Sequence, residues 1–236
     1  MALPFFFEEN LKDQSTFVLS EDTSRHITQV LRMHKGENLK ITNGKGEVLT
    51  CQVVNENKKA TEVKILSIDI DEPPAKKITI AISLIKNNSR FEWFLEKAAE
   101  IGVSEIIPML CERTEKQHFR YDRMRNILIS AMLQSQQSRL PLLQLSADFK
   151  QIVQLRNDPQ KFIAHCDEST KGSLKDQANN SPGSTIILIG PEGDFTKGEI
   201  DMAHHNNFTS TSLGATRLRT ETAGIVAAVI LKNMGT

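Results

Sequence analysis

The sequence predicts an α/β protein in two parts, a small β-rich N-terminal domain and a larger α/β domain. Short strand-like runs follow one another through the first part of the chain. Pro73 and Pro74 then interrupt the pattern, because neither would be tolerated inside a sheet. Beyond them, continuous apolar runs alternate with amphipathic segments, which is typical of parallel strands joined by helices. We therefore expect domains at residues 1–70 and 78–236, joined by a linker at 71–77.

In the N-terminal part, aromatic and β-branched residues predict five strands and one helix. Ser20 offers a side-chain cap for a helix that would reach about Met33. Asn43-Gly44, between two alternating runs, is typical of a β-hairpin. The spacing favours a small barrel, with strands expected at Phe5–Phe7, Thr16–Leu19, Leu39–Thr42, Val48–Val54 and Thr61–Ile68.

The C-terminal part predicts alternating strands and helices. Buried strands are expected at Ile78–Leu84, Ile106–Leu110, Phe162–Cys166 and Thr185–Ile189, and helices at Ser89–Ile101, Tyr121–Ser138, from Lys197 onward, and at Glu221–Asn233. Thr196 and Glu199 match a capping box, which places the start of the third helix. The last helix is apolar on nearly every side, so it must be buried within the domain or against a second subunit. The polar residues 167–183 predict a surface loop.

The composition excludes several classes of protein. The 29 basic and 29 acidic residues give a net charge of +0, which excludes a protein that holds nucleic acid by its total charge. No apolar run approaches the ~18 residues of a membrane span. Three separated cysteines, Cys51, Cys111 and Cys166, predict reduced thiols and a cytoplasmic protein. His204 and His205 would point about 100° apart on a helix, so we expect no metal site.

Two glycine-containing loops near the C-terminus carry the strongest functional signal. Residues 189–196 follow the expected strand Thr185–Ile189, and residues 212–223 are likewise expected between a strand and a helix, so both loops lie where α/β proteins bind ligands. Gly190, Gly193 and Gly214 permit a close approach of the backbone to a ligand. Spacing alone predicts a ligand site, and an ordinary strand-to-helix turn is an equal alternative for either loop taken singly.

The two loops contain the motifs Gly190-Pro191-Glu192-Gly193, Leu213-Gly214 and Leu218-Arg219-Thr220-Glu221-Thr222-Ala223. These motifs closely resemble the signature of the ribosomal RNA small subunit methyltransferase E family, which belongs to the SPOUT superfamily. The resemblance covers nearly the whole chain and is weaker in the N-terminal part. The chain departs from the family pattern in three places: Asp194 stands where a glycine is frequent, Thr216 where an arginine is frequent, and Leu133-Gln134-Ser135-Gln136-Gln137 where an acid and an arginine are common.

The resemblance implies a PUA-like β-barrel followed by a SPOUT α/β domain with a deep trefoil knot. It also implies a homodimer with the active site at the subunit interface. Family members use S-adenosyl-L-methionine to methylate N3 of one uridine in 16S ribosomal RNA, so the small ribosomal subunit is the expected partner. The implied cofactor-binding residues are Gly190, Pro191, Glu192, Gly193, Leu213, Gly214, Leu218, Thr220, Glu221, Thr222 and Ala223.

The chemistry requires that the N3 proton be removed and that negative charge on the uracil oxygens be stabilised. Arg219, Arg113 and Arg139 are the candidates for that stabilisation, in this order. The sequence names no general base, because Glu221 is equally explained as an acid favoured at a helix start.

RNA contacts are implied for Arg25, His26, Arg32, Lys35, Lys86 and Arg90. Basic residues are concentrated in two stretches: five against one acid between residues 25 and 45, and six, Lys116 among them, against two between residues 113 and 139. A solvated surface is the commoner role of such stretches. Two alternative functions stay open: a non-catalytic RNA-binding or assembly factor on the same fold, and a transfer RNA 2′-O-methyltransferase.

Overall fold

The chain folds into two compact units. The computed structural model describes residues 3–11, 14–115, 118–166 and 171–234. The first unit holds residues 1–73 and 132–140, and the second unit holds residues 74–131 and 141–236. The division therefore falls inside the segment that we expected to be a linker, although strand β6 already begins at Lys76. The sequence did not predict that residues 132–140 belong with the first unit.

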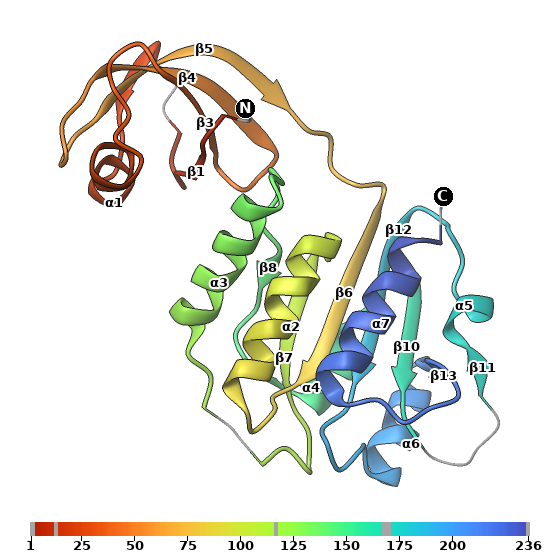
Figure 1. Cartoon of the computed structure of the whole chain (residues 1–236). Helices are drawn as coiled ribbons and strands as arrows, with labels where there is room; N and C mark the ends of the chain where they lie inside the picture. The colour runs from red at the N-terminus through yellow and green to blue at the C-terminus, as the bar shows by residue number, and fades with distance from the viewer. Residues whose placement is uncertain (1–2, 12–13, 116–117, 167–170, 235–236) are drawn as a thin grey trace. The chain divides into compact units, whose positions relative to one another are not determined.

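A curled five-stranded sheet forms the first unit (Figure 1). Its strands lie in the order β1 (Phe5–Phe7), β3 (Asn38–Thr42), β4 (Glu47–Asn55), β5 (Glu62–Ile70) and β2 (Thr16–Val18). The pair β1–β3 is parallel and the other pairs are antiparallel. Alternate side chains point inward, and Leu39, Ile41 and Val53 are fully buried in one core. The five predicted strands are confirmed, with ends shifted by one or two residues.

The helix predicted from Ser20 is shorter than expected. The Ser20 hydroxyl accepts the N–H of Thr23, as a cap should, and α1 spans Glu21–Arg25. From His26 to Val30 the chain continues as a π-helical turn, and Arg32 then adopts a φ of +54°. The wider turn and the left-handed residue end the helical segment at Val30, before Met33.

A larger, parallel sheet forms the second unit. Its strands lie in the order β11 (Gly172–Ser173), β13 (Thr209–Ser212), β10 (Gln160–Ala164), β12 (Gly183–Ile189), β6 (Lys76–Ser83), β7 (Glu105–Leu110) and β8 (Leu142–Leu143), and β9 (Ala147–Asp148) also pairs with β7. All of these pairs are parallel. The apolar runs of β6 and β12 are buried, as their continuous hydrophobicity predicted.

Helices cover both faces of this sheet (Figure 1). One face carries α2 (Asn88–Ile101), α3 (Tyr121–Gln134) and α7 (Thr220–Lys232), and the other carries α4 (Phe149–Leu155) and α6 (Lys197–His205). The predicted α3 extended to Ser138, but the helix ends at Gln134. The segment predicted as a polar loop contains β11 and α5 (Leu174–Gln177), while residues 167–170 lie outside the described residues.

The apolar helix α7 is buried against α2 and β6. This is burial within the domain, the first of the two alternatives that the sequence left open. Gly224 allows this close approach, because a Cβ atom there would lie 2.6 Å from the Phe94 ring. The burial is incomplete: Val229 on α7 is 39% exposed and Trp93 on α2 is 43% exposed.

Candidate active site

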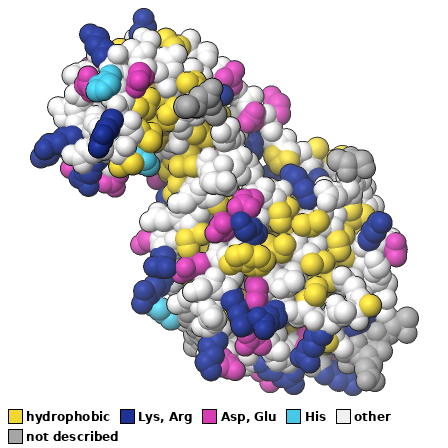
Figure 2. All heavy atoms as spheres, in the orientation of Figure 1, with side chains coloured by type: hydrophobic (Ala, Val, Ile, Leu, Met, Phe, Trp, Pro, Cys, Tyr) yellow, Lys and Arg dark blue, Asp and Glu magenta, His cyan; other side chains and the backbone are white. Residues whose placement is uncertain are grey.

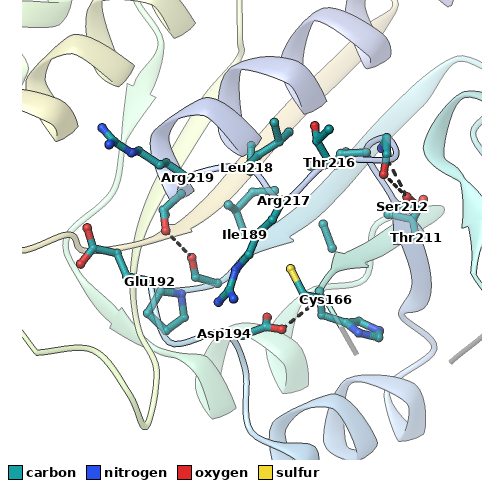
Figure 3. Close-up of a pocket in the computed structure, with 18 of the residues that line it drawn as sticks. Cys166, Ile189, Glu192, Asp194, Thr211, Ser212, Thr216, Arg217, Leu218 and Arg219 are labelled. Atoms are coloured by element: carbon teal, nitrogen blue, oxygen red, sulfur yellow. Dashed lines mark hydrogen bonds between the residues drawn. The ribbon is translucent and has the colours of Figure 1, made fainter. Parts of the chain in front are cut away.

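A pocket lies at the carboxyl edge of the parallel sheet (Figure 3). Strands β13, β10 and β12 are neighbours and run in the same direction, so the loops that follow them meet at one edge. These loops enclose a cavity of about 780 Å³. Its walls come from residues 164–166, 189–192 and 211–220, together with Arg90, Lys171, Asp194 and Ala223.

The loop after β12 is fixed by contacts with its neighbours. Thr220 Oγ1 donates to the Gly190 carbonyl oxygen at 3.0 Å, which ties the start of α7 to this loop. Arg113 Nη1 donates to the Gly193 carbonyl oxygen at 2.7 Å. A Cβ atom at Gly190 would lie 3.0 Å from the Phe195 ring, so packing favours glycine at this position.

Asp194 links the loop after β12 to the loop after β10. Its φ of +62° lies in the left-handed region, which agrees with the glycine that is frequent at this position in the resembling family. A non-glycine residue there costs roughly 1–2 kcal/mol. Asp194 Oδ2 accepts the N–H of Cys166 at 2.8 Å, and Oδ1 accepts the N–H of Phe195 at 2.9 Å. These two hydrogen bonds offset the backbone strain.

The loop after β13 adds apolar surface and backbone groups to the cavity. Gly214 has a φ of +144°, which L-residues rarely adopt. The Ser212 hydroxyl donates to the Gly214 carbonyl oxygen at 3.0 Å and accepts its N–H at 3.3 Å. Leu213 and Leu218 are half-buried in the cavity wall. The Ser212 side chain therefore holds this loop in a turn.

Two arginines of this loop extend in different directions (Figure 3). The Arg217 side chain extends across the pocket in the direction of Asp194 and Cys166. The Arg219 side chain extends the other way, on the side of Glu192. Both arginines are exposed, and neither side chain makes a hydrogen bond or ion pair with another described residue.

Arg90, in the first turn of α2, lies between two carboxylates. Its Nη1 is 3.4 Å from Glu192 Oε1, and its Nε is 3.7 Å from Glu221 Oε1. The Glu221 side chain is only 7% exposed, and its Oε2 has no hydrogen-bond partner in the described part of the chain. Glu221 lies in the first turn of α7, where a carboxylate interacts favourably with the positive end of the helix.

A polar network beside the pocket was missed by the sequence-based reasoning. His165 Nε2 lies 2.7 Å from Ser210 Oγ, which also lies 2.7 Å from His204 Nε2. Lys171 Nζ donates to the His165 carbonyl oxygen at 2.7 Å. His165 and Lys171 line the pocket. His165 lies in the predicted strand Phe162–Cys166, but only the order of the strands in the sheet places it beside the other two loops.

Most of the predicted cofactor-binding residues come together in this pocket. Those that line it are Gly190, Pro191, Glu192, Leu213, Gly214, Leu218, Thr220 and Ala223. The other three, Gly193, Glu221 and Thr222, belong to the same two segments but do not line the cavity.

The three candidate arginines do not meet at one site. Arg219 lines the pocket, and Arg113 holds the Gly193 carbonyl group next to it. Arg139 belongs to the first unit, where its Nη1 donates to the Lys45 carbonyl oxygen at 2.8 Å and its Nη2 donates to the Asp71 carbonyl oxygen. This guanidinium joins the turn before β4 to the end of β5, and Arg139 does not line the pocket described above.

The predicted RNA-contacting residues are distributed over both units. Arg25, His26, Arg32 and Lys35 are exposed in the first unit. In the second unit, Lys86 is exposed and pairs with Glu115 at 3.1 Å, whereas Arg90 belongs to the pocket wall. Lys116 lies outside the described residues. On the face shown in Figure 2, basic and acidic side chains are interspersed over the second unit.

Other sequence-based expectations concern metals, membranes and thiols. Within residues 3–11, 14–115, 118–166 and 171–234, no group of three or more His, Cys, Asp or Glu is placed to hold a metal ion. No helix of that part is long and apolar enough to cross a bilayer. Cys51 and Cys111 are buried, and burial raises the pKa of the Cys51 thiol to about 11. Cys166 is exposed at the pocket.

Comparison with known protein families matches both parts of the chain. Residues 71–232 match an RNA methyltransferase domain, and residues 19–66 match an RNA methyltransferase PUA domain. The ribosomal RNA small subunit methyltransferase E of Mesomycoplasma hyopneumoniae is 32% identical over 225 residues, which cover 93% of this chain and 95% of that protein.

Solved structures share the whole fold. A protein from Porphyromonas gingivalis, described as a probable rRNA methyltransferase, is 32% identical with a TM-score of 0.91 over 98% of both chains. The ribosomal RNA small subunit methyltransferase E of Neisseria gonorrhoeae, solved with S-adenosyl methionine bound, is 29% identical with a TM-score of 0.85, covering 96% of this chain and 95% of that one. The chain therefore belongs to the ribosomal RNA small subunit methyltransferase E family.

Proposed function

We propose that this protein transfers a methyl group from S-adenosyl-L-methionine to N3 of a specific uridine in 16S ribosomal RNA of the small subunit. The observation that carries the proposal is the pocket. Three loops at the ends of neighbouring parallel strands enclose a cavity of about 780 Å³, and these loops lie in the part of the chain that matches an RNA methyltransferase domain. The cofactor is supported by the relative from Neisseria gonorrhoeae, which was solved with S-adenosyl methionine. The choice of uridine N3 is supported by the motif resemblance.

The side chains present fit this cofactor. Ile189, Leu213 and Leu218 offer apolar surface for an adenine ring, and the backbone groups of the loops offer donors and acceptors for its edge. The carboxylates of Glu192 and Asp194 suit hydroxyl, ammonium and sulfonium groups. When bound, S-adenosyl-L-methionine supplies an electrophilic methyl group. We assign its binding to the motif residues that line the pocket, with Gly193, Glu221 and Thr222 supporting the same loops.

The pocket wall also carries more positive than negative charge. Four cations, Arg90, Lys171, Arg217 and Arg219, face two carboxylates, so the surplus suits a phosphate group of RNA. The target uridine must leave any stack to reach such a pocket. We propose that Arg219 then stabilises charge on the uracil oxygens, while Arg113 holds the loop through Gly193.

The remaining parts of the proposal follow from the family resemblance. Residues 1–70 would form a PUA-like RNA-binding barrel, with Arg25, His26, Arg32 and Lys35 on the RNA together with Lys86 of the second domain. Residues 78–236 would form a SPOUT domain with a deep trefoil knot, and the enzyme would act in the cytoplasm as a homodimer. Trp93 and Val229 support the dimer, because Figure 2 shows hydrophobic side chains reaching the surface over the face of α2 and α7.

Mapping of modified nucleosides tests the proposed reaction. We expect 16S RNA from a strain without this protein to lack one N3-methyluridine, and we expect the cloned chain to restore it. Unchanged N3-methyluridine would overturn the uridine-N3 assignment, and loss of a 2′-O-methylated transfer RNA nucleoside would replace it with the alternative reaction. Calorimetric titration with S-adenosyl-L-homocysteine tests the cofactor separately, since a non-catalytic RNA-binding protein would not bind it.

A further inference from the structure

We propose that Arg90 acts together with Arg219: Arg90 stabilises the negative charge that one of the uracil oxygens acquires as N3 loses its proton, and the buried Glu221 positions Arg90 for this role. The inference rests on the proposed function and deepens it. It gives Arg90 a part in the reaction beyond RNA binding, and it gives Glu221 a part that differs from cofactor contact.

The five arginines considered for the site differ in how they are held. A group that stabilises developing charge is most effective when it is already in place before the reaction. Arg139 is engaged in the first unit, and Arg113 donates to the Gly193 carbonyl group. Arg217 and Arg219 line the pocket but make no hydrogen bond or ion pair with another described residue. Arg90 lines the pocket and is also held by carboxylates, so it is already in place where the charge would develop.

The two carboxylates beside Arg90 have different environments. Glu192 belongs to the loop after β12 and its side chain is 51% exposed, so incoming RNA can displace it from Arg90 Nη1. Glu221 is buried in the first turn of α7 and stays 3.7 Å from Arg90 Nε. The Arg90 guanidinium can therefore exchange Glu192 for a substrate oxygen while Glu221 keeps its orientation.

Burial of the Glu221 carboxylate costs free energy, because the charged group loses its contact with water. A buried carboxylate needs charge partners, and those of Glu221 are the helix N-terminus and Arg90. Its Oε2 has no hydrogen-bond partner within the described residues, which leaves an acceptor for a second N–H of a rearranged Arg90. Glu221 does not line the cavity, and its ion pair with Arg90 connects it to a side chain that does.

The proposed step changes no covalent bond of either residue. N3 of the uracil gives its proton to water, and its electron pair forms the bond to the methyl carbon. The sulfur–carbon bond breaks, the sulfur keeps that electron pair, and neutral S-adenosyl-L-homocysteine results. After N3 has lost its proton and before the methyl group is transferred, the uracil carbonyl oxygens carry their greatest negative charge. Arg90 donates N–H groups to one of these oxygens in that state. It thereby lowers the pKa of the bound uracil N3.

Four variants and one matched control test the inference: Arg90→Ala, Arg90→Lys, Glu221→Gln, the double variant Arg90→Ala/Glu221→Gln, and Glu92→Gln. Glu92 of α2 also belongs to a carboxylate–arginine pair, with Arg123 of α3 at 2.6 Å, but it does not line the pocket. The substrate is small ribosomal subunits from the strain without this protein. The measurements are kcat between about pH 6 and pH 9.5, the Kd for S-adenosyl-L-homocysteine, and the thermal midpoint.

Arg90→Ala should lower kcat near neutral pH about 100-fold or more, and part of that loss should be recovered at high pH. Activity should recover at high pH because removal of the cation raises the pKa of the bound uracil N3, so N3 loses its proton only at a higher pH. Arg90→Lys should retain an intermediate activity. Glu221→Gln should lower kcat about tenfold with a Kd within about threefold of wild type, and the double variant should be no slower than Arg90→Ala. Glu92→Gln should match wild type.

Several results would overturn the inference. Arg90→Ala with a kcat close to wild type would remove Arg90 from the reaction, as would an equal loss at every pH. If Glu221→Gln chiefly weakens S-adenosyl-L-homocysteine binding, Glu221 is a cofactor residue and does not position Arg90. Multiplying losses in the double variant would show independent roles. Failure of the proposed function is recognised separately, because the wild-type protein would then form no N3-methyluridine in the same assay.

Discussion

Gly224 lies where α7 packs against α2, and there is no room for a methyl group at this position. A Cβ atom would lie 2.6 Å from Phe94 Cε2 and 3.0 Å from Ile82 Cδ1, and both of these side chains are fully buried. Overpacking in a core costs about 1–3 kcal/mol. Alanine in place of glycine inside a helix gains about 1 kcal/mol. We therefore expect Gly224→Ala to lower the free energy of unfolding by about 1 kcal/mol.

Urea unfolding followed by circular dichroism measures this change. Gly198→Ala in α6 is the matched control, because a Cβ atom at Gly198 would meet no atom within 4 Å beyond its chain neighbours and its own helix backbone, so the substitution should not destabilise. Phe94→Leu makes room next to Gly224, so the two substitutions together should cost less than the sum of the two alone. A Gly224→Ala protein as stable as wild type, or additive losses with Phe94→Leu, would refute the packing argument.

Three further variants test the site, the proposed RNA surface and the sheet. Arg219→Ala should abolish methylation with S-adenosyl-L-homocysteine affinity within a few-fold, and full activity would remove Arg219 from the mechanism. Charge reversal of Arg25 and Arg32 together should weaken binding to small subunits and flatten its salt dependence, and an unchanged slope in binding titrations would place the RNA elsewhere. Burial raises the pKa of Asp158, but hydrogen bonds from Arg156 and Ser184 outweigh burial and hold this pKa below its ordinary value. The stability that Asp158 provides is therefore present above about pH 4 and lost as the pH falls. In thermal unfolding, the deficit of Asp158→Asn should shrink between about pH 7 and pH 3, and a constant deficit would contradict this.

The sequence predicted the long elements because their signals are local. Continuous apolar runs marked β6, β7 and β12, and Thr196 and Glu199 form the capping box that their spacing indicated. Short elements such as β8, β9 and α4 were missed, because two to seven residues are too few to establish a period. The end of α3 was misplaced for a different reason. Gln136 adopts a φ of +55°, and a non-glycine residue gives no sign of that conformation.

The candidate site was predictable in part. Two of its loops were found because each contains glycines and follows a predicted strand. The third loop, at His165 and Cys166, was missed because its place depends on strand order, which puts β10 between β13 and β12. Strand order is a non-local property that spacing along the chain does not reveal. The place of Arg139 was not predicted for the same reason, since Gly46 N–H donates to the Ser138 carbonyl oxygen and so helps bind this segment to the first unit.

Equal numbers of acidic and basic residues do not produce a neutral site, because the pairs are formed unevenly. At the amino edge of the parallel sheet, Arg156 is paired with both Glu105 and Asp158, so its charge is used within the fold. At the carboxyl edge, Arg217 and Arg219 have no carboxylate partner among the residues that the structure describes. A paired cation is held for stability or orientation, whereas an unpaired one gains most from an arriving anion. From this unequal pairing we expect RNA to approach the carboxyl edge, where the pocket lies, although the chain has no excess of basic residues.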